Sequence, residues 1–319
     1  MLPVIDFAAV RAHDDAGTRA AAMAIRAACL TDGFFYLINH GVPAPVIDAV
    51  HAEGQRFFRL PPAVKRLAAV NARHRGFNAL GDALMYEARK PDHKEFFSIG
   101  LDLPEDDPDM LAGEKLRGPN NWPPEMPAFR AALEAYYAAM LACGADLMRA
   151  VAVSLDLDAA FFVPRYRKPL QRTQIVYYPP QPAALGEDQF GVAPHSDFGC
   201  ITLLWQDTNG GLEVLERSTQ RWIPALPVPG TLVVNVADLL ARWTNDRYAS
   251  TPHRVINRSG RERLSIATFH DPDYKAVVDP RDLGTPDGEC RYEPILAGEH
   301  IVGRIERSFG YRKTLATSA

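Results

Sequence analysis

His195 and Asp197 are the residues of this chain best placed to bind a metal, because a single residue separates them. In an extended chain the side chains at positions i and i+2 point to the same side, so one imidazole and one carboxylate can reach the same ion. A second imidazole, His253, lies much further along the chain. Two histidines and one carboxylate form the facial triad of non-haem iron(II) sites, which leaves the opposite positions open for a co-substrate and O2.

Arg263 and Ser265 repeat this spacing and predict a site for a carboxylate. A guanidinium is a planar, permanently charged fork that binds a carboxylate through two parallel hydrogen bonds. Beside a metal pocket, such an arginine is expected to anchor the far end of a dicarboxylate. Each of these pairs is weak evidence when it stands alone, because a lone histidine is more often a core or surface residue than a ligand. The segments around the pairs therefore decide the interpretation.

Seven segments in order along the chain strengthen it: Leu2–Phe7, Gly33–Pro43, Ala193–Asp207, Gly210–Val214, Pro229–Asn235, Asp238–Asn245 and Ser250–Val255. Together they resemble the isopenicillin N synthase-like branch of the iron(II)/2-oxoglutarate-dependent oxygenase superfamily. The resemblance extends over nearly the whole chain, and the combination of segments is highly specific. It implies a non-haem dioxygenase that hydroxylates or desaturates a small organic molecule with O2 and releases succinate and CO2.

The resemblance also implies roles for individual residues. The metal ligands are His195, Asp197 and His253, and the residues that bind 2-oxoglutarate are Arg263, Ser265 and Tyr178. Plant members often have asparagine two residues before that tyrosine, where this chain has Val176. Other polar and aromatic residues between the ligands are interpreted as structural, fixing turns and buried hydrogen bonds: Asn235, Asp238, Trp243 and Asn245.

Three alternative functions are considered. Two are enzymes that use the same iron site, and the third is a protein without catalytic activity. An oxidase or cyclase of the isopenicillin N synthase type needs O2 but no 2-oxoglutarate, and its Arg-x-Ser pair binds the substrate's own carboxylate. An ethylene-forming enzyme consumes 2-oxoglutarate itself. A non-catalytic binding protein on the same fold would have no evident need for the triad together with Arg263 and Ser265. The sequence does not indicate which substrate is used.

The composition excludes several classes of protein. The chain has 319 residues, 47% of them hydrophobic, and a net charge of −4 without blocks of like charge. We therefore expect a sizeable core and neither a nucleic-acid nor a membrane partner. The four cysteines have no Cys-x-x-Cys spacing, which favours free thiols in a reducing cytoplasm. The N-terminus has no basic segment followed by an apolar one, so no signal peptide is expected.

The order of the expected elements predicts an α+β fold, with helices early and strands late. We expect helices near residues 19–30, 44–59, 127–155 and 297–314, and short apolar strands near residues 2–7, 34–38, 173–178, 200–205, 212–215, 232–236, 254–257 and 264–269. The resemblance identifies the strands as a double-stranded β-helix, or jelly roll. The whole chain, 1–319, is interpreted as a single catalytic domain. Within it, 1–164 is mainly helical with loops, 165–296 is the jelly-roll core with the iron site, and 297–319 is a C-terminal helix and tail.

Residues 71–124 show poor periodicity and many Gly, Pro and charged residues. Loops of this length are often functional, so we expect this segment to form part of the pocket mouth. Its aromatic residues Phe77, Tyr86 and Phe97 are candidates for lining the substrate pocket. Phe269, four residues beyond Ser265, is expected opposite them.

Overall fold

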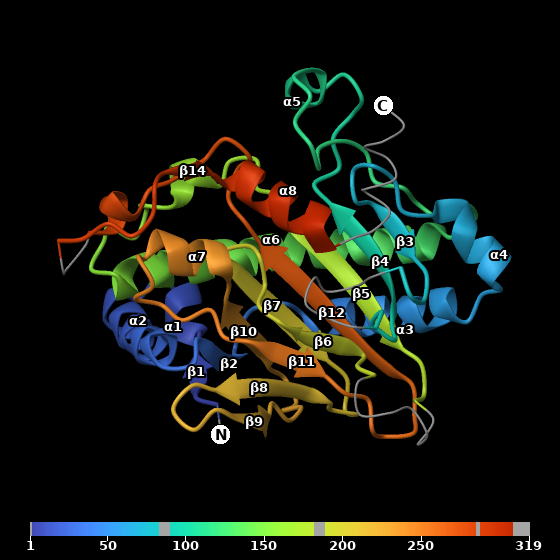
Figure 1. The fold of residues 1–319 in the computed structure, drawn as a ribbon, viewed down its shortest axis with the longest axis horizontal. Helices are drawn as coiled ribbons and strands as arrows, with labels where there is room; N and C mark the ends of the chain where they lie inside the picture. Colours follow the sequence, from blue (N-terminus) through green and yellow to red (C-terminus); the bar gives the residue numbers. More distant parts are fainter. Residues whose placement is uncertain (1, 83–89, 182–188, 285–287, 309–319) are drawn as a thin grey trace.

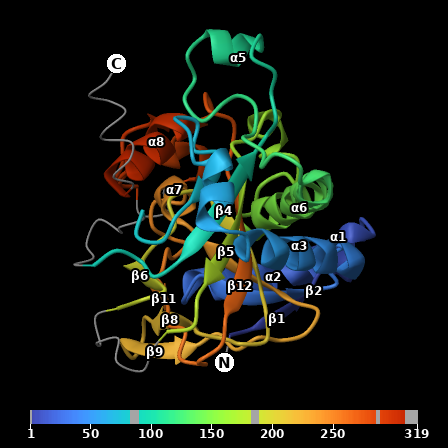
Figure 2. The same cartoon turned by 90° about the vertical axis from the view of Figure 1, so that its right-hand side faces the viewer.

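Two β-sheets that face each other form the centre of the protein (Figures 1 and 2). The computed structural model describes residues 2–82, 90–181, 189–284 and 288–308. Within these residues, the larger sheet has eight strands in the order β1-β2-β10-β7-β12-β5-β4-β3, and the smaller has four in the order β6-β11-β8-β9. This is the α+β fold with a jelly-roll core that the sequence predicts.

The larger sheet consists of β1 (Val4–Asp6), β2 (Phe34–Ile38), β10 (Leu232–Val236), β7 (Ile201–Gln206), β12 (Arg263–His270), β5 (Arg172–Tyr178), β4 (Glu95–Gly100) and β3 (Gly76–Asn78). The smaller sheet consists of β6 (Val192–His195), β11 (His253–Val255), β8 (Leu212–Glu216) and β9 (Arg221–Pro224). A separate pair is formed by β13 (Val277–Val278) and β14 (Ile295–Leu296). Among these described strands, every strand pair other than β1 with β2 is antiparallel.

Strands from the N-terminal part complete the larger sheet at both edges. On one side β2 pairs with β10, and on the other β4 pairs with β5. The larger sheet therefore contains strands from both sides of residue 164, the boundary that the sequence predicted between the mainly helical part and the jelly-roll core. The two parts share one sheet and one core.

The helices are α1 (Ala8–Arg11), α2 (Asp15–Leu30), α3 (Ala44–Phe58), α4 (Pro62–Lys65), α5 (Pro108–Leu111), α6 (Pro127–Ser154), α7 (Asp238–Trp243) and α8 (Ala297–Ser308). Figure 2 shows α2, α3 and α6 on one side of the larger sheet, with the smaller sheet on the other. Helix α2 starts four residues before the expected Arg19, because the side chain of Asp14 accepts hydrogen bonds from the backbone N–H groups of Ala16 and Gly17.

Helix α6 is the main scaffold behind the sheet. The apolar residues that recur at helical spacing in its sequence are all buried: Phe129, Leu133, Tyr136, Met140, Leu147 and Val151. In the described part of the chain, α6 alone is long and apolar enough to span a membrane by length and composition, and 56% of its apolar window is buried inside the protein. Its packing against α2, α3 and β12 identifies it as a core helix.

Candidate active site

His195 and His253 meet because β6 and β11 are antiparallel neighbours in which these two residues lie directly opposite each other. Their ring centroids are 4.3 Å apart. This pairing brings together two histidines that lie far apart in the sequence. The sequence does not predict β6 itself, since Pro194 interrupts the strand pattern. A proline is tolerated there because β6 is an edge strand of the smaller sheet.

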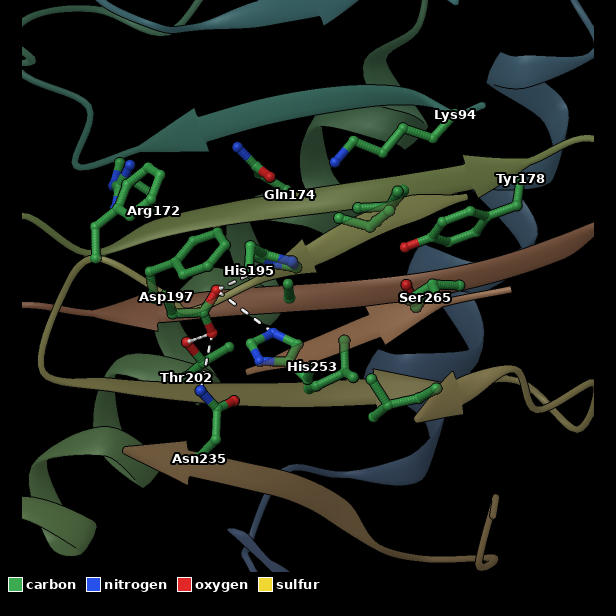
Figure 3. Close-up of a pocket in the computed structure, with 18 of the residues that line it drawn as sticks. Lys94, Arg172, Gln174, Tyr178, His195, Asp197, Thr202, Asn235, His253 and Ser265 are labelled. Atoms are coloured by element: carbon green, nitrogen blue, oxygen red, sulfur yellow. Dashed lines mark hydrogen bonds and ion pairs between the residues drawn. The ribbon is translucent and has the colours of Figure 1, made fainter. Parts of the chain in front are cut away.

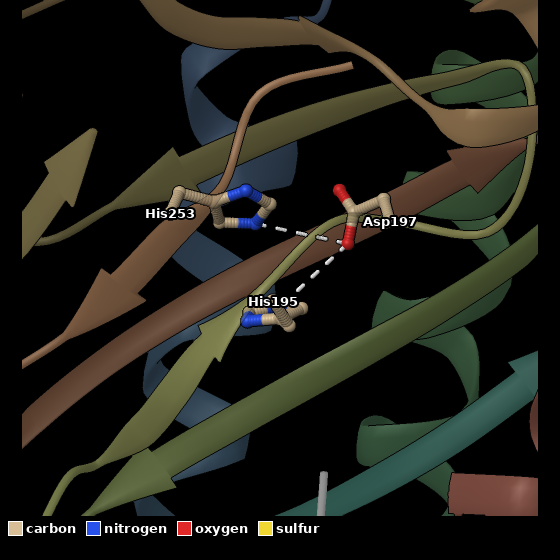
Figure 4. A group of neighbouring side chains, drawn as sticks. All are labelled: His195, Asp197 and His253. Carbon is tan, nitrogen blue, oxygen red and sulfur yellow. Dashed lines mark ion pairs between the residues drawn. The ribbon is translucent and has the colours of Figure 1, made fainter. Parts of the chain in front are cut away.

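Asp197 lies just beyond the end of β6, so the strand alternation alone does not position it. Its backbone carbonyl accepts a hydrogen bond from the N–H of Asp238 over 2.9 Å. Its Oδ2 accepts hydrogen bonds from Thr202 Oγ1 at 2.6 Å and from Asn235 Nδ2 at 2.9 Å. These contacts turn Oδ1 toward both imidazoles, and it lies 3.7 Å from Nε2 of His195 and 3.7 Å from Nε2 of His253 (Figure 4).

The far nitrogen of each imidazole is held by the backbone. Nδ1 of His195 lies 2.8 Å from the carbonyl oxygen of Ala193, and Nδ1 of His253 lies 3.3 Å from that of Thr251. A carbonyl only accepts, so Nδ1 carries the proton and Nε2 presents its lone pair to the centre of the group. Metal-binding histidines are oriented in this way.

The charge states also suit a metal. Burial lowers the pKa of His195 to about 3, and His253 adds to the effect, so this imidazole is neutral at pH 7. Burial opposes ionisation of Asp197, but the two imidazoles and the hydrogen bonds from Thr202 and Asn235 hold the pKa of its carboxyl below the usual range. One atom from each of the three residues lies within 4.8 Å of the others. Two imidazoles and one carboxylate in this arrangement fit a divalent transition metal with open positions.

Asp238 ties the segments that carry the ligands to one another. Its Oδ1 accepts a hydrogen bond from Oγ of Ser250, which precedes His253 in the sequence, at 2.7 Å. Its Oδ2 accepts a hydrogen bond from Oγ of Ser196, which lies between His195 and Asp197, at 3.1 Å. Arg304 of α8 completes the arrangement, with Nη2 at 2.7 Å from Oδ2. The structural roles predicted for Asn235 and Asp238 are thus visible as hydrogen bonds to the ligand segments.

A cavity opens beside the three residues and lies between the two sheets (Figure 3). Alternate residues of β5 line it, and each lies opposite a lining residue of β12: Tyr178 with Arg263, Val176 with Ser265, Gln174 with Ala267, and Arg172 with Phe269. Two residues of a strand span about 6.6–6.8 Å, so this wall is about 20 Å long. Tyr178 and Ser265 lie at one end, Arg172 at the other, and the His–Asp–His group lies between them.

Arg263 is 1% exposed. Its Nε donates to the carbonyl of Gly210 at 2.5 Å, its Nη1 donates to Ser265 Oγ at 3.3 Å, and its Nη2 donates to Gln206 Oε1 at 3.2 Å. Its guanidinium stacks on Tyr178, 4.6 Å from the ring centroid. No carboxylate forms an ion pair with it in the described part of the chain. Arg263, Ser265 and Tyr178, which the sequence singled out, thus form one corner of the cavity around an unneutralised buried cation.

The substrate-pocket candidates fall into different places. Phe269 lines the cavity. Phe77 and Phe97 do not, and this corrects the expectation from sequence. They belong to an aromatic core cluster with Phe57, whose ring centroid lies 5.7 Å from that of Phe77 and 5.2 Å from that of Phe97. Alternation along β4 turns Phe97 toward the helices, away from the cavity. Tyr86 lies outside the described residues.

Sequence reasoning missed several residues that line the cavity, and four of them have long polar or ring-bearing polar side chains. Segment 71–124 does contribute to it, but through His74 and Lys94 rather than through Phe77 or Phe97. Arg172 and Gln174 are the other two. They could have been found from the sequence, because they continue the i, i+2 alternation backwards from Tyr178 and Val176 along one strand.

Comparisons with known proteins agree with this geometry. A family model described as the N-terminal region of non-haem dioxygenases in morphine synthesis matches residues 2–125, and that of the 2OG-Fe(II) oxygenase superfamily matches residues 169–272. A 2-oxoglutarate-Fe(II) type oxidoreductase of Aspergillus fumigatus is 34% identical over 321 residues, which cover 97% of this chain and 95% of the relative. A 2-oxoglutarate-dependent dioxygenase of Monascus ruber is 35% identical over 296 residues, covering 90% and 89%.

Solved structures resemble the whole chain. A full-length protein of Neurospora crassa, solved in complex with alpha-KG and thymine, is 30% identical with a TM-score of 0.84, and the match covers 95% of this chain and 96% of that one. A 2OG-Fe(II) oxygenase family protein of Caulobacter crescentus is 31% identical with a TM-score of 0.83, covering 96% and 98%.

Proposed function

Because this chain belongs to the iron(II)- and 2-oxoglutarate-dependent oxygenases, we propose that His195, Asp197 and His253 hold its iron and that Arg263 anchors its 2-oxoglutarate. Enzymes of this family oxidise small molecules with Fe(II), 2-oxoglutarate and O2, and so does this one. Bound iron(II) would supply the O2 activation: one oxygen atom enters succinate, with loss of CO2, and the other ends in the hydroxylated product or, in a desaturation, in water. We propose hydroxylation or desaturation of a C–H-bearing substrate as the outcome.

The metal assignment is supported by three observations. The donor atoms converge within 4.8 Å. The Nε2 lone pairs are directed inward by the backbone carbonyls of Ala193 and Thr251. The outer oxygen of Asp197 is fully engaged by Thr202 and Asn235, which leaves Oδ1 as the one oxygen available to an ion. Three ligands on one side of the cavity leave the other side open to small molecules.

The assignment of 2-oxoglutarate rests on Arg263. A buried guanidinium without an acidic partner is costly, and a dicarboxylate that enters the cavity supplies the missing charge. Ser265 lies beside it and can donate a further hydrogen bond. The charges then balance, since iron(II) with Asp197 leaves +1 and the dianion with Arg263 leaves −1. Val176, where plant relatives often have asparagine, faces the same part of the cavity and removes one polar contact without removing the anchor.

The protein's own contribution is to orient the reactants and to exclude water from them. Asp197 and His253 are buried, and Tyr178, Val192, Leu212 and Val255 cover the cavity with apolar surface. In such a site charged interactions are stronger than in water, and side reactions with solvent are suppressed.

Replacing Arg263 by alanine tests the co-substrate site. Truncating one side of a buried charge pair costs about 2–5 kcal/mol, so the Kd for 2-oxoglutarate, measured by anaerobic calorimetry, should rise by roughly 30- to 5,000-fold. Iron content should stay at the wild-type level. Arg221→Ala on β9, an exposed arginine outside the cavity, is the matched control and should leave Kd unchanged. An unaltered Kd in Arg263→Ala would refute the assignment.

The reaction itself is tested by coupled product formation. Substrate-dependent release of succinate and CO2, with a mass change in the substrate, is the expected result. Substrate oxidation without succinate would instead indicate the isopenicillin N synthase type of chemistry. The similarity to a protein solved with bound thymine makes pyrimidine bases the first compounds to screen.

We also propose a cytoplasmic location. Cys29, Cys143 and Cys200 are free and buried, and Cys290 is free and exposed, as expected of a protein kept in a reducing compartment. Fractionation of the source cells tests this, and recovery in a secreted or membrane fraction would contradict it.

A further inference from the structure

We propose that the end of the cavity around Gln174 and Arg172 receives a neutral, planar molecule with a cyclic amide edge, and that Gln174 determines this specificity. The inference rests on the proposed function, since it assigns the Arg263 end of the cavity to 2-oxoglutarate. It goes further by naming the chemical class of the substrate and the residue that recognises it.

Cross-strand pairing arranges the wall of the cavity in rows. The rows of Arg263 with Tyr178 and of Ser265 with Val176 lie at the co-substrate end. The next two rows lie beyond them. Their members that line the cavity are Leu204, Ala267 and Gln174, followed by Thr202, Phe269 and Arg172. Thr202, in the last row, donates a hydrogen bond to Asp197, so this row lies next to the proposed metal site. A second molecule bound there therefore reaches the proposed iron.

Polar atoms in these two rows lack partners. The amide of Gln174 makes no hydrogen bond to any described residue, although the residue is half-buried and lines the cavity. Nε of Arg172, which also lines the cavity, is buried without a partner among the described residues. Leaving buried polar groups unpaired costs stability, so the arrangement indicates a ligand that supplies both donors and acceptors.

The charges at this end favour a neutral ligand. Arg172 Nη2 lies 3.2 Å from Oδ2 of Asp271, and Lys94 Nζ lies 3.0 Å from Oδ2 of Asp92. Each of these cations is thus already matched by a buried carboxylate, in contrast to Arg263. A carboxylate substrate would offer only acceptors and would add an uncompensated negative charge. A cyclic amide offers an N–H and a C=O side by side, which pair with the C=O and NH2 of Gln174 through two parallel hydrogen bonds.

The shape of the last two rows favours a flat ring. Phe269 provides an aromatic face that is backed by Arg172, whose guanidinium lies 5.0 Å from the ring centroid. Ala267, between Gln174 and Leu204, has the smallest side chain in its row and leaves room above it. Figure 3 shows Lys94, Gln174 and Arg172 along one side of the cavity, across from His195 and Asp197. A ring held against Phe269 with its polar edge toward Gln174 presents its other edge to the metal site.

Binding of four six-membered rings tests the proposal, using the full-length protein loaded with Fe(II) and 2-oxoglutarate without O2. The probes are 2-pyridone and 4-pyrimidone as cyclic amides, benzoate as a carboxylate, and benzene as a ring without a polar edge. We expect the Kd values of the two amides to be at least tenfold lower than those of benzoate and benzene. Tighter binding of benzoate, or binding of benzene equal to that of the amides, would overturn the assignment.

Gln174→Glu and Gln174→Leu isolate the role of the side chain. Glu removes the donor and keeps the shape, and Leu removes both polar atoms. Each should weaken amide binding at least tenfold while the Kd for 2-oxoglutarate stays unchanged. Gln220→Glu, at an exposed turn between β8 and β9, is the charge-matched control. If 2-oxoglutarate fails to bind the wild type, the proposed function fails; if it binds and the amides do not, this inference alone fails.

Discussion

Asn235 donates a hydrogen bond from Nδ2 to Oδ2 of Asp197 over 2.9 Å, and this contact leaves Oδ1 as the carboxylate oxygen that faces the imidazoles. Removing it should free the carboxylate to rotate. We predict that Asn235→Ala weakens iron binding by about 10- to 100-fold, the effect typical of groups that orient a metal ligand. Anaerobic titration with Fe(II) measures this. Thr202→Val should act in the same direction, because Thr202 binds the same oxygen. Unchanged iron affinity in both variants would show that Asp197 needs no orienting partners.

How far the sequence predicts the site depends on the kind of information involved. The types and spacings of His195, Asp197, His253, Arg263 and Ser265 made them candidates, the resemblance of the surrounding segments selected them, and the structure brings all five to one cavity. The spacing argument for Asp197 was incomplete, because the residue follows the strand rather than belonging to it. Hydrogen bonds from residues far along the chain position it, and no local pattern reports those.

Sequence reasoning failed to predict to which side of the larger sheet the side chains of Phe77 and Phe97 point. Phe77 and Phe97 are aromatic residues in a poorly periodic segment, and their composition alone suggested a pocket wall. Whether a strand residue points into the cavity or toward the helices depends on register, and a shift of one residue reverses it. The pairing of β4 with β5 settles this, since Ser98 lies opposite the cavity residue Gln174 and Phe97 opposite the core residue Ile175.

Phe97 and Phe269 should therefore respond differently to truncation. Phe97 is fully buried among Phe57, Phe129 and Trp122, so Phe97→Ala should lower the free energy of unfolding by about 3–5 kcal/mol. Phe269 is half-buried in the cavity, and Phe269→Ala should raise the KM for the substrate found in the succinate screen, with a smaller loss of stability. Urea denaturation and steady-state kinetics separate the two. The reverse outcome would restore Phe97 to the substrate pocket.

Removing either histidine should abolish iron binding. The two residues left in His195→Ala or His253→Ala cannot compete with water for Fe(II), and each variant should lose both metal and turnover while keeping its fold. Metal analysis after purification, with circular dichroism on the same samples, measures this. His13→Ala, at an exposed position before α2, provides the control for loss of a histidine. Full iron content and activity in the His195 variant would disprove the triad.

Asp238 provides the last prediction, because it binds both ligand segments without touching the cavity. Asp238→Ala removes the acceptor for Ser196 and Ser250 and the ion-pair partner of Arg304. We expect a loss of about 1–3 kcal/mol in the free energy of unfolding and iron affinity reduced about tenfold, since both His253 and Asp197 lose their shared support. Ser196→Ala removes a single one of these contacts and should show a smaller effect on both quantities. Asp238→Asn retains an acceptor oxygen for one serine and should be intermediate. If Asp238→Ala lowers stability but binds iron as tightly as the wild type, the carboxylate stabilises the fold without positioning the ligands.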